Sequence, residues 1–248
     1  MEFNFGEKYR AASNRLILLD YDGTLVDYKP LPAQAFPEPH VLNILYEITW
    51  RSATKLVIVT GRAANDIDRL IGHLGVDIIA EHGAEIKMDG VWIPQVEKDV
   101  SWKNKVLPLF DKISSTCPNS FIEEKNFSVA WHYRNCDIEY GRIHSRALIN
   151  VLEIFVQAYD LEIFDGNMLV EVITKKTNKG RAIQELIGKT NYDYILCMGD
   201  DVTDEYMFKF LSDNPNAYTV KVGEQETAAK YRVNTVEQVI RILEKIAT

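Results

Sequence analysis

Two carboxylates separated by one residue, Asp20 and Asp22, follow a run of four apolar residues and precede Gly23. Such a run is typical of a strand buried on both faces, and the carboxylates would stand at its carboxyl end. Residues i and i+2 of a strand point to the same side, so the two side chains are expected to lie close together. A divalent cation or a shared proton must then relieve their repulsion, and Mg²⁺ prefers oxygen ligands of this kind. The alternative is an ordinary turn after a strand, because Asp and Gly are common turn residues.

More residues able to do chemistry stand at the ends of other apolar runs or at the start of an expected helix. They are Thr60, Lys179, Asp200 and Asp201. The carboxyl ends of parallel strands meet at one edge of a sheet, so we expect these side chains to converge with Asp20 and Asp22. Taken singly, each has a structural alternative: Thr60 could begin a helix, Lys179 could be solvated, and Asp201 could favour a helix N-terminus.

The segments that must position these side chains alternate between apolar runs, which predict strands, and apolar stripes at helical spacing, which predict helices. Expected strands cover residues 16–19, 56–59, 78–80, 194–198 and 217–222, and expected helices cover residues 41–51, 67–74, 179–188 and 235–246. This order predicts an α/β core with a Rossmann-like parallel sheet, made of residues 1–96 and 173–248. Four prolines between Lys29 and Pro39 predict an irregular loop after the first strand.

Residues 97–172 follow a different pattern, in which helical spacing alternates with paired strand patterns. Helices are expected at residues 102–113 and 143–159, and hairpins at residues 121–132 and 161–172. The second hairpin is expected to turn at Asp165-Gly166, because an Asp-Gly pair suits a two-residue turn. This order predicts an α+β domain with an antiparallel sheet, inserted into the core as a cap.

The composition limits the classes of partner. The chain has 248 residues, 46% of them hydrophobic, which is enough for a packed core in one domain or two unequal ones. Its 36 acidic and 28 basic residues give a formal charge of −8, which argues against nucleic acid or an anionic membrane as the main partner. Apolar runs fall far short of the roughly 20 residues that cross a bilayer, and no signal-peptide pattern is present. We therefore expect a soluble, cytoplasmic protein.

The motifs together resemble those of a known superfamily. A DxDGT string, then a hydroxyl residue, a lysine and a GDDxTDE string, in this order, are similar to the haloacid dehalogenase (HAD) phosphotransferases. Within that superfamily the sequence resembles the trehalose-6-phosphate phosphatases more closely, through DYDGTL, VTGR, AEHGAEI, FSVAWHYRN, GNMLVEV, NKG and GDDVTDEYMF. The resemblance extends from about Arg15 to Val222, and it implies a HAD core with an inserted cap domain.

The resemblance also assigns chemical roles. It implies that Asp20 attacks phosphorus as a nucleophile, and that Asp22 protonates the leaving sugar oxygen and later deprotonates water. Thr60 and Lys179 would bind the phosphoryl oxygens, on which charge gathers during transfer. The implied ligands of Mg²⁺ are the side chain of Asp20, the backbone carbonyl of Asp22 and the side chain of Asp200, with Asp201 or Asp204 in support.

Substrate-binding residues are expected in both parts of the chain. Glu123, Lys125, Arg134 and Glu171 match positions at which this family's cap contacts sugar, and His132 and Asn167 are close to them in sequence. Gly61, Arg62 and His82 are expected to reach the ligand from the core. As alternatives, the charges at 123–125 could form a solvated turn, and Asn167 could be a hairpin turn residue.

The function implied is a Mg²⁺-dependent phosphatase that hydrolyses trehalose 6-phosphate through an aspartyl-phosphate intermediate. Two alternatives stay open. One is a HAD phosphatase for another sugar phosphate, such as sucrose 6-phosphate. The other is a non-catalytic domain that senses sugar phosphates within a trehalose synthase-phosphatase assembly, because the residues up to Arg15 resemble the linker that precedes the phosphatase part of such proteins. The partner expected from this resemblance is a trehalose-6-phosphate synthase, either as a domain of the same protein or as a separate protein.

Overall fold

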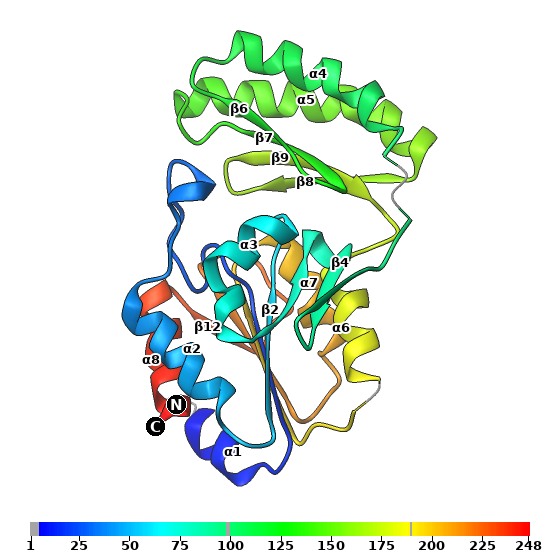
Figure 1. Cartoon of the computed structure of the whole chain (residues 1–248). Coiled ribbons are helices and arrows are strands. Elements are labelled where there is room, and N and C mark those ends of the chain that lie inside the picture. Colours follow the sequence, from blue (N-terminus) through cyan, green and yellow to red (C-terminus); the bar gives the residue numbers. More distant parts are fainter. Residues whose placement is uncertain (1–4, 98–99, 189) are drawn as a thin grey trace. The chain divides into compact units, whose positions relative to one another are not determined.

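The computed structural model describes residues 5–97, 100–188 and 190–248. The chain forms two compact units (Figure 1). The first unit is made of Met1–Pro94 and Asn178–Thr248, and the second is Gln95–Thr177. The inserted unit thus begins two residues before, and ends five residues after, the limits 97–172 expected from the sequence.

A mostly parallel sheet forms the centre of the first unit, with the strand order β12-β11-β10-β1-β2-β3-β4-β5. The strands are β1 Arg15–Leu19, β2 Thr54–Val59, β3 Asp77–Ala80, β4 Glu85–Met88, β5 Val91–Pro94, β10 Tyr194–Gly199, β11 Ala217–Val222 and β12 Tyr231–Val233. β1 lies between β10 and β2 and is parallel to both, while β4 and β5 form an antiparallel hairpin at one edge. The short strand β12, at the other edge, was not expected from the sequence.

Helices cover both faces of this sheet. The helices α1 Phe5–Ala11, α2 Pro39–Thr49, α3 Ala64–Ile71 and α8 Val236–Ala247 pack on one face, and α6 Lys179–Ile187 and α7 Glu205–Phe210 pack on the other. Alternate residues of β1 serve the two faces: Ile17 joins the first cluster and Leu18 the second, both without solvent exposure. Burial on both faces is the reason that this strand is a continuous apolar run.

The loop with four prolines contains one short turn of 3₁₀ helix, Pro32–Gln34, so the expectation of a wholly irregular segment was wrong. The proline ring at the start of this turn needs no hydrogen-bond partner for its nitrogen. α2 begins at Pro39, which suits the first turn of a helix for the same reason. Further 3₁₀ turns occupy Gly72–Leu74, Glu81–Gly83 and Val202–Asp204.

The second unit is a four-stranded antiparallel sheet, ordered β6-β7-β9-β8, with two helices. The elements are α4 Lys103–Thr116, β6 Phe121–Glu124, β7 Ser128–His132, α5 Ile138–Tyr159, β8 Leu161–Gly166 and β9 Leu169–Thr174. One apolar cluster joins the helices to one face of the sheet, with Trp131, Val129 and Val172 from the strands and Phe110 and Leu152 from the helices. α5 begins five residues earlier than expected, because the Asp137 carboxylate accepts a hydrogen bond from the Tyr140 backbone N–H and caps the helix.

The turn of the second hairpin in this unit was placed wrongly from the sequence. Asp165 and Gly166 lie within β8, where they pair with Val170 and Leu169 of β9. The two-residue turn is therefore Asn167-Met168, and Met168, its second residue, has a positive φ of 59°, as the second central residue of a type II turn does. Strand pairing therefore includes the Asp-Gly pair in β8, which ends at Gly166.

In the described part of the chain, none of the helices combines the length and the apolar character needed to cross a bilayer.

Replacement of Leu18 by Ala should lower the free energy of unfolding by about 2–5 kcal/mol, because the strand is close-packed on both faces and a cavity would remain. Val91→Ala, at a position 60% exposed on the edge strand β5, is the matched control and should cost less than about 1 kcal/mol. Urea denaturation followed by circular dichroism measures both. Equal losses would contradict the two-sided burial of β1.

Candidate active site

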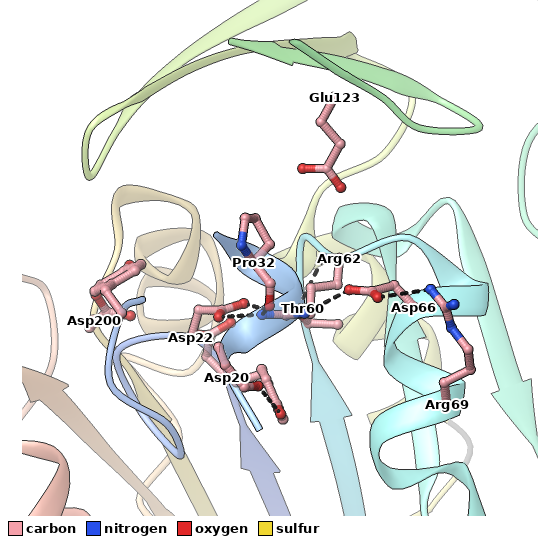
Figure 2. Close-up of polar contacts among 12 residues, drawn as sticks. Asp20, Asp22, Pro32, Thr60, Arg62, Asp66, Arg69, Glu123 and Asp200 are labelled. Carbon is pink, nitrogen blue, oxygen red and sulfur yellow. Dashed lines mark hydrogen bonds and ion pairs between the residues drawn. The ribbon is translucent and has the colours of Figure 1, made fainter. Parts of the chain in front are cut away.

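Acidic side chains from two neighbouring strands meet at the carboxyl edge of the parallel sheet. β1 and β10 pair in parallel up to Leu19 and Met198, and the Asp20 backbone N–H donates to the Met198 carbonyl at 3.0 Å. Carboxylate oxygens of Asp20, Asp200 and Asp204 consequently lie within 4.8 Å of one another. Figure 2 shows Asp20, Asp22 and Asp200 at this edge.

A buried lysine lies between two of these carboxylates. Lys179 is the first residue of α6, and Asn178 caps that helix by accepting a hydrogen bond from the Arg181 backbone N–H at 2.9 Å. The Lys179 ammonium donates to Asp20 Oδ1 at 2.7 Å and to Asp204 Oδ1 at 2.8 Å. Lys179 is 2% exposed, so its ammonium is an internal counter-charge for the acidic cluster.

One ammonium does not offset the charge of three carboxylates, of which Asp20 and Asp204 are buried and Asp200 is half-buried. Burial raises the pKa of Asp20 from 3.8 to about 7, although Lys179 lowers it. Burial, and then the neighbouring carboxylates of Asp20 and Asp204, hold the pKa of Asp200 well above its ordinary value. Burial disfavours the charged form of Lys179, but the two carboxylates outweigh this and raise its pKa. The cluster therefore favours a further positive charge at this place.

The cluster fits a hard divalent cation. Its donors are carboxylate oxygens, which suit such ions, and Oδ1 of Asp200 is buried without a hydrogen-bond partner in the described part of the chain. The expected ligands were the side chains of Asp20 and Asp200 and the backbone carbonyl of Asp22, with Asp201 or Asp204 in support, and the carboxylates that come together are those of Asp20, Asp200 and Asp204. The structure thus brings Asp204 into the group by its side chain.

Asp201 has a different position from the cluster. Its Oδ1 accepts a hydrogen bond from the Val202 backbone N–H at 2.7 Å, and its own backbone N–H donates to Asp204 Oδ2 at 3.0 Å. The second contact, together with a hydrogen bond from the Asp204 backbone N–H to the Asp201 side chain, closes a capping box at the start of the short 3₁₀ turn before α7. Asp201 therefore shapes the turn that carries Asp204, and a role as a direct metal ligand stays a prediction.

Two further side chains hold Asp200. The Tyr28 hydroxyl donates to Asp200 Oδ2 at 2.9 Å, and the ammonium of the buried Lys221 donates to the Asp200 carbonyl oxygen at 2.6 Å. Gly23 lies against the same carboxylate, with a positive φ of 78°, and a Cβ there would collide with Asp200. The DxDGT glycine is needed because of both its conformation and this close approach.

Thr60 follows β2, the other neighbour of β1, and is 1% exposed. Its backbone N–H donates to the Ile79 carbonyl at 2.8 Å, and its Oγ1 accepts from the Arg62 backbone N–H at 3.1 Å. These contacts fix the position of the hydroxyl, which has its own hydrogen to donate.

Arg62 was expected at the substrate, but its guanidinium binds carboxylates of the core. It donates from Nε to Asp22 Oδ2 at 2.7 Å and from Nη2 to Asp22 Oδ1 at 2.8 Å, as a two-point pair (Figure 2). Nη1 donates to Asp66 Oδ2 at 2.6 Å. Burial opposes the charge of Arg62, but the carboxylates of Asp22 and Asp66 outweigh it and raise the pKa of the guanidinium.

Gly61 and His82, also expected at the substrate, pack against each other. A Cβ on Gly61 would lie 2.6 Å from the His82 ring, so only glycine leaves room for the imidazole. His82 is 5% exposed, has a φ of 56° and donates its backbone N–H to the Thr60 carbonyl at 3.1 Å. A contact of either residue with a substrate stays a prediction.

The sheet of the second unit has one apolar and one polar face. Residues facing the helices are apolar, and the alternate residues of the same strands include the polar Glu123, Ser128, His132 and Glu171, with Lys125 directly after β6. The Lys125 ammonium and the Ser128 hydroxyl donate to Glu171 Oε1, at 2.8 Å and 2.5 Å. The sequence-predicted Glu123, Lys125, His132 and Glu171 are therefore neighbours on one face.

The Glu123 carboxylate lies 2.8 Å from His132 Nε2, and the His132 ring stacks on Phe121 with ring centroids 4.6 Å apart. Burial raises the pKa of Glu123, but Lys125 and His132 together outweigh it and lower that pKa below its ordinary value. Arg134 Nη2 donates to the Asn167 backbone carbonyl at 2.6 Å, which links these two predicted residues at the hairpin turn. The face thus offers donors, ionised acceptors and an aromatic ring.

Some of the residues that build the core site were missed from the sequence. Asp66 stands four residues after Arg62 at the start of α3, so the i,i+4 rule for helical ion pairs could have suggested the contact. Tyr28 lies in the loop before the prolines, and Lys221 lies in a strand. No local sequence pattern distinguishes either of them.

Proteins of one family resemble this chain over most of its length. Residues 18–237 match the family described as trehalose-phosphatase. The bifunctional trehalose-6-phosphate synthase/phosphatase of Thermoproteus tenax is 36% identical over 239 residues, which cover 96% of this chain and 32% of that protein. The trehalose-phosphatase of Saccharomyces cerevisiae is 31% identical over 282 residues, which cover 96% of this chain and 31% of that protein. The chain spans about a third of the length of these curated relatives.

Solved structures with the same fold align with most of this chain. The C-terminal domain of the C. albicans trehalose-6-phosphate phosphatase aligns with a TM-score of 0.93 at 30% identity, over 98% of this chain and 95% of that domain. A haloacid dehalogenase-like hydrolase from B. subtilis aligns with a TM-score of 0.64 at 17% identity, over 92% and 98% of the two chains, which shows a shared fold. The expected HAD fold, an α/β core with an inserted cap, is confirmed.

Replacement of Lys179 by Met should lower the free energy of unfolding by about 3–5 kcal/mol at pH 8, because two buried carboxylates lose their counter-charge. The pKa of Asp20 is raised to about 7, so the folded state binds a proton that the unfolded state releases near pH 4. Stability of the metal-free protein therefore falls as pH rises from about 4 to 7. Protonation at pH 5 should restore part of the loss in the variant.

The measurement is urea denaturation in EDTA at pH 5 and pH 8. Lys209→Met, which removes an exposed lysine from α7, is the control and should change stability by less than about 0.5 kcal/mol. A loss in Lys179→Met that is the same at both pH values would show that the ammonium does not compensate the carboxylates.

Proposed function

The chain belongs to the trehalose-phosphatase family, and on this premise we propose that it hydrolyses trehalose 6-phosphate to trehalose and phosphate. The observation that carries the proposal is the ion pair of Lys179 with Asp20, the first carboxylate of the DxDGT string, at 2.7 Å. The ion pair holds the Asp20 carboxylate at the carboxyl edge of the parallel sheet, where such folds bind ligands, and a carboxylate in that place can act as a nucleophile.

In the first step of the proposed reaction, an Asp20 carboxylate oxygen attacks phosphorus and the bond from phosphorus to the sugar oxygen breaks. Asp22 gives a proton to that oxygen, and trehalose leaves. Water then attacks phosphorus, Asp22 takes a proton from the water, and the acyl-phosphate bond breaks to release phosphate. Each side chain returns to its starting state, so the aspartyl phosphate splits one difficult displacement into two.

The charge that gathers on the phosphoryl oxygens requires fixed donors. Thr60 offers a hydroxyl held by backbone contacts, and Lys179 offers an ammonium that is already oriented by Asp20 and Asp204. Donors that are oriented before the reaction cost no reorganisation during it, and this is the larger part of catalysis in phosphoryl transfer.

We propose that the cation held by the acidic cluster is Mg²⁺. Asp20, Asp200 and Asp204 would supply carboxylates, with the backbone carbonyl of Asp22 as the further ligand implied by the family, and Asp201 would support them. When bound, the ion supplies positive charge beside the phosphoryl oxygens. The unpaired Oδ1 of Asp200 and the raised pKa of Asp200 support this assignment.

The polar face of the inserted sheet is proposed to select the sugar. Glu123 and Glu171 offer carboxylate acceptors, while Lys125 and His132 offer nitrogen groups, and sugar hydroxyls can pair with both kinds. A site built for many hydroxyls discriminates strongly against ligands that lack them, because its buried polar groups would be left unpaired. A disaccharide phosphate therefore suits this face better than a monosaccharide phosphate.

A synthase is the proposed partner. The T. tenax relative is named as a synthase and phosphatase in one chain, and this chain matches 32% of its length. We propose that the phosphatase works beside a trehalose-6-phosphate synthase, as a domain of the same protein or as a separate one.

A panel of sugar phosphates tests the substrate. With Mg²⁺ present, kcat/KM for trehalose 6-phosphate should exceed those for sucrose 6-phosphate and glucose 6-phosphate by at least about 100-fold, because a site made for hydroxyls leaves its groups unpaired with the wrong sugar. Phosphate release is measured for each compound. A preference for sucrose 6-phosphate would support the alternative sugar phosphatase, and no release from any of them would support a sensing domain.

The control variant in this panel is Asp20→Asn, which keeps the shape of the side chain but removes the nucleophile. Its turnover should fall by more than about 10³-fold, while the protein stays folded. Unchanged turnover would rule out the aspartyl-phosphate route.

A further inference from the structure

The Arg62 guanidinium uses four of its five N–H groups in contacts inside the first unit. Nε and Nη2 donate to the two oxygens of Asp22, at 2.7 and 2.8 Å, and Nη2 also donates to the Pro32 carbonyl at 2.8 Å. Nη1 donates to Asp66 Oδ2 at 2.6 Å. Figure 2 shows Arg62 between Asp22 on one side and Asp66 on the other. The residue is 6% exposed, so little of it is left to meet a ligand.

Arg62 is itself held firmly. Its backbone N–H donates to Thr60 Oγ1 at 3.1 Å, and its carbonyl accepts from the Glu81 backbone N–H at 3.0 Å. The guanidinium carbon lies 4.9 Å from the centroid of the Tyr21 ring, and the Tyr21 hydroxyl donates to the Ala35 carbonyl at 2.8 Å. Stacking on a fully buried ring limits the directions that the guanidinium can take.

Asp22, in contrast, depends on Arg62. Within the described residues, both hydrogen bonds of the Asp22 carboxylate come from this guanidinium. Rotation about χ2 of Asp is otherwise broad, so a lone carboxylate after a strand would not have one direction. Two parallel bonds from a planar fork fix the plane of the carboxylate as well as its position.

We infer that Arg62 is a positioning residue for Asp22, which sets the direction of the carboxylate that transfers the proton, and that it is not a substrate ligand. The inference rests on the proposed function for the role of Asp22, and it goes further by naming what places that group. Asp66 extends the arrangement, because it holds the third nitrogen of the guanidinium from the first turn of α3.

The type of cation matters in this arrangement. Lysine would keep the positive charge but would bind as a single point, without the fork that matches both carboxylate oxygens. In Arg62→Lys, Asp22 should keep its charge partner and lose its fixed plane. A small misplacement of a catalytic group costs about 100-fold in rate. We therefore expect kcat for trehalose 6-phosphate to fall about 10- to 100-fold, with KM changed less than about threefold.

A substrate with a good leaving group separates positioning of Asp22 from general damage to the site. The p-nitrophenolate ion leaves without needing a proton, so formation of the aspartyl phosphate from p-nitrophenyl phosphate does not need Asp22 as an acid. The burst of p-nitrophenolate in Arg62→Lys should therefore keep a rate within about threefold of the unaltered protein. General damage to the phosphate site would slow the burst as much as it slows turnover of the sugar phosphate.

Arg69→Lys is the matched control. Arg69 donates to the other oxygen of Asp66 at 3.2 Å, but it is 78% exposed and makes no contact with Asp22 among the described residues. This variant should leave both reactions unchanged. Asp66→Asn, which weakens only the contact of Arg62 with α3, should lower kcat for trehalose 6-phosphate less than Arg62→Lys does. If Arg62→Lys folds poorly, Asp66→Asn replaces it as the test variant.

A crystal structure of Arg62→Lys provides a readout that needs no turnover. The Asp22 carboxylate should leave the plane that it has in the unaltered protein; an unmoved carboxylate, or kcat equal to that of the unaltered protein, would overturn the inference. A sugar-phosphate panel without any turnover in the unaltered protein would instead refute the proposed function, and the crystal structure would still decide what Arg62 does.

Discussion

A single buried ammonium group between two carboxylates is the contact on which the rest of the site depends. Lys179 reaches Asp20 at 2.7 Å and Asp204 at 2.8 Å from a position 159 residues away from Asp20 in the chain. Without this counter-charge, burial would favour a protonated Asp20, which is a poor nucleophile. The parallel sheet makes the contact possible, because β1 and β10 end side by side and α6 begins beside them.

A second ion pair, between Arg62 and Asp22, holds the other carboxylate of the DxDGT string in place. The two aspartates are two residues apart, and each is bound by a different cation from a different part of the chain. Lysine binds its partners as a point charge, whereas arginine fixes the plane of a carboxylate. This difference suits a nucleophile that can use a neighbouring cation and a proton carrier that must face one direction.

Strand ends were predictable from the sequence, because burial on both faces makes β1, β2 and β10 continuous apolar runs that stop at polar residues. Contacts that depend on the direction of a side chain were not predictable in this way. The binding of Arg62 to Asp22 cannot be deduced from spacing, since rotamers and packing decide it. The hairpin turn at Asn167-Met168 was missed for a similar reason, because strand pairing outweighed the local Asp-Gly signal. The position of Asp201 at the start of a helical turn was, by contrast, one of the alternatives drawn from the sequence.

The most direct measurement is chemical trapping of the phosphorylated enzyme. Borohydride added during turnover of trehalose 6-phosphate reduces an aspartyl phosphate to homoserine, and mass spectrometry of the peptides locates the altered residue. Modification at residue 20, dependent on substrate and lost in Asp20→Asn, is the expected result. Turnover without any trapped residue, or with modification at residue 22 instead, would contradict a nucleophile held by Lys179.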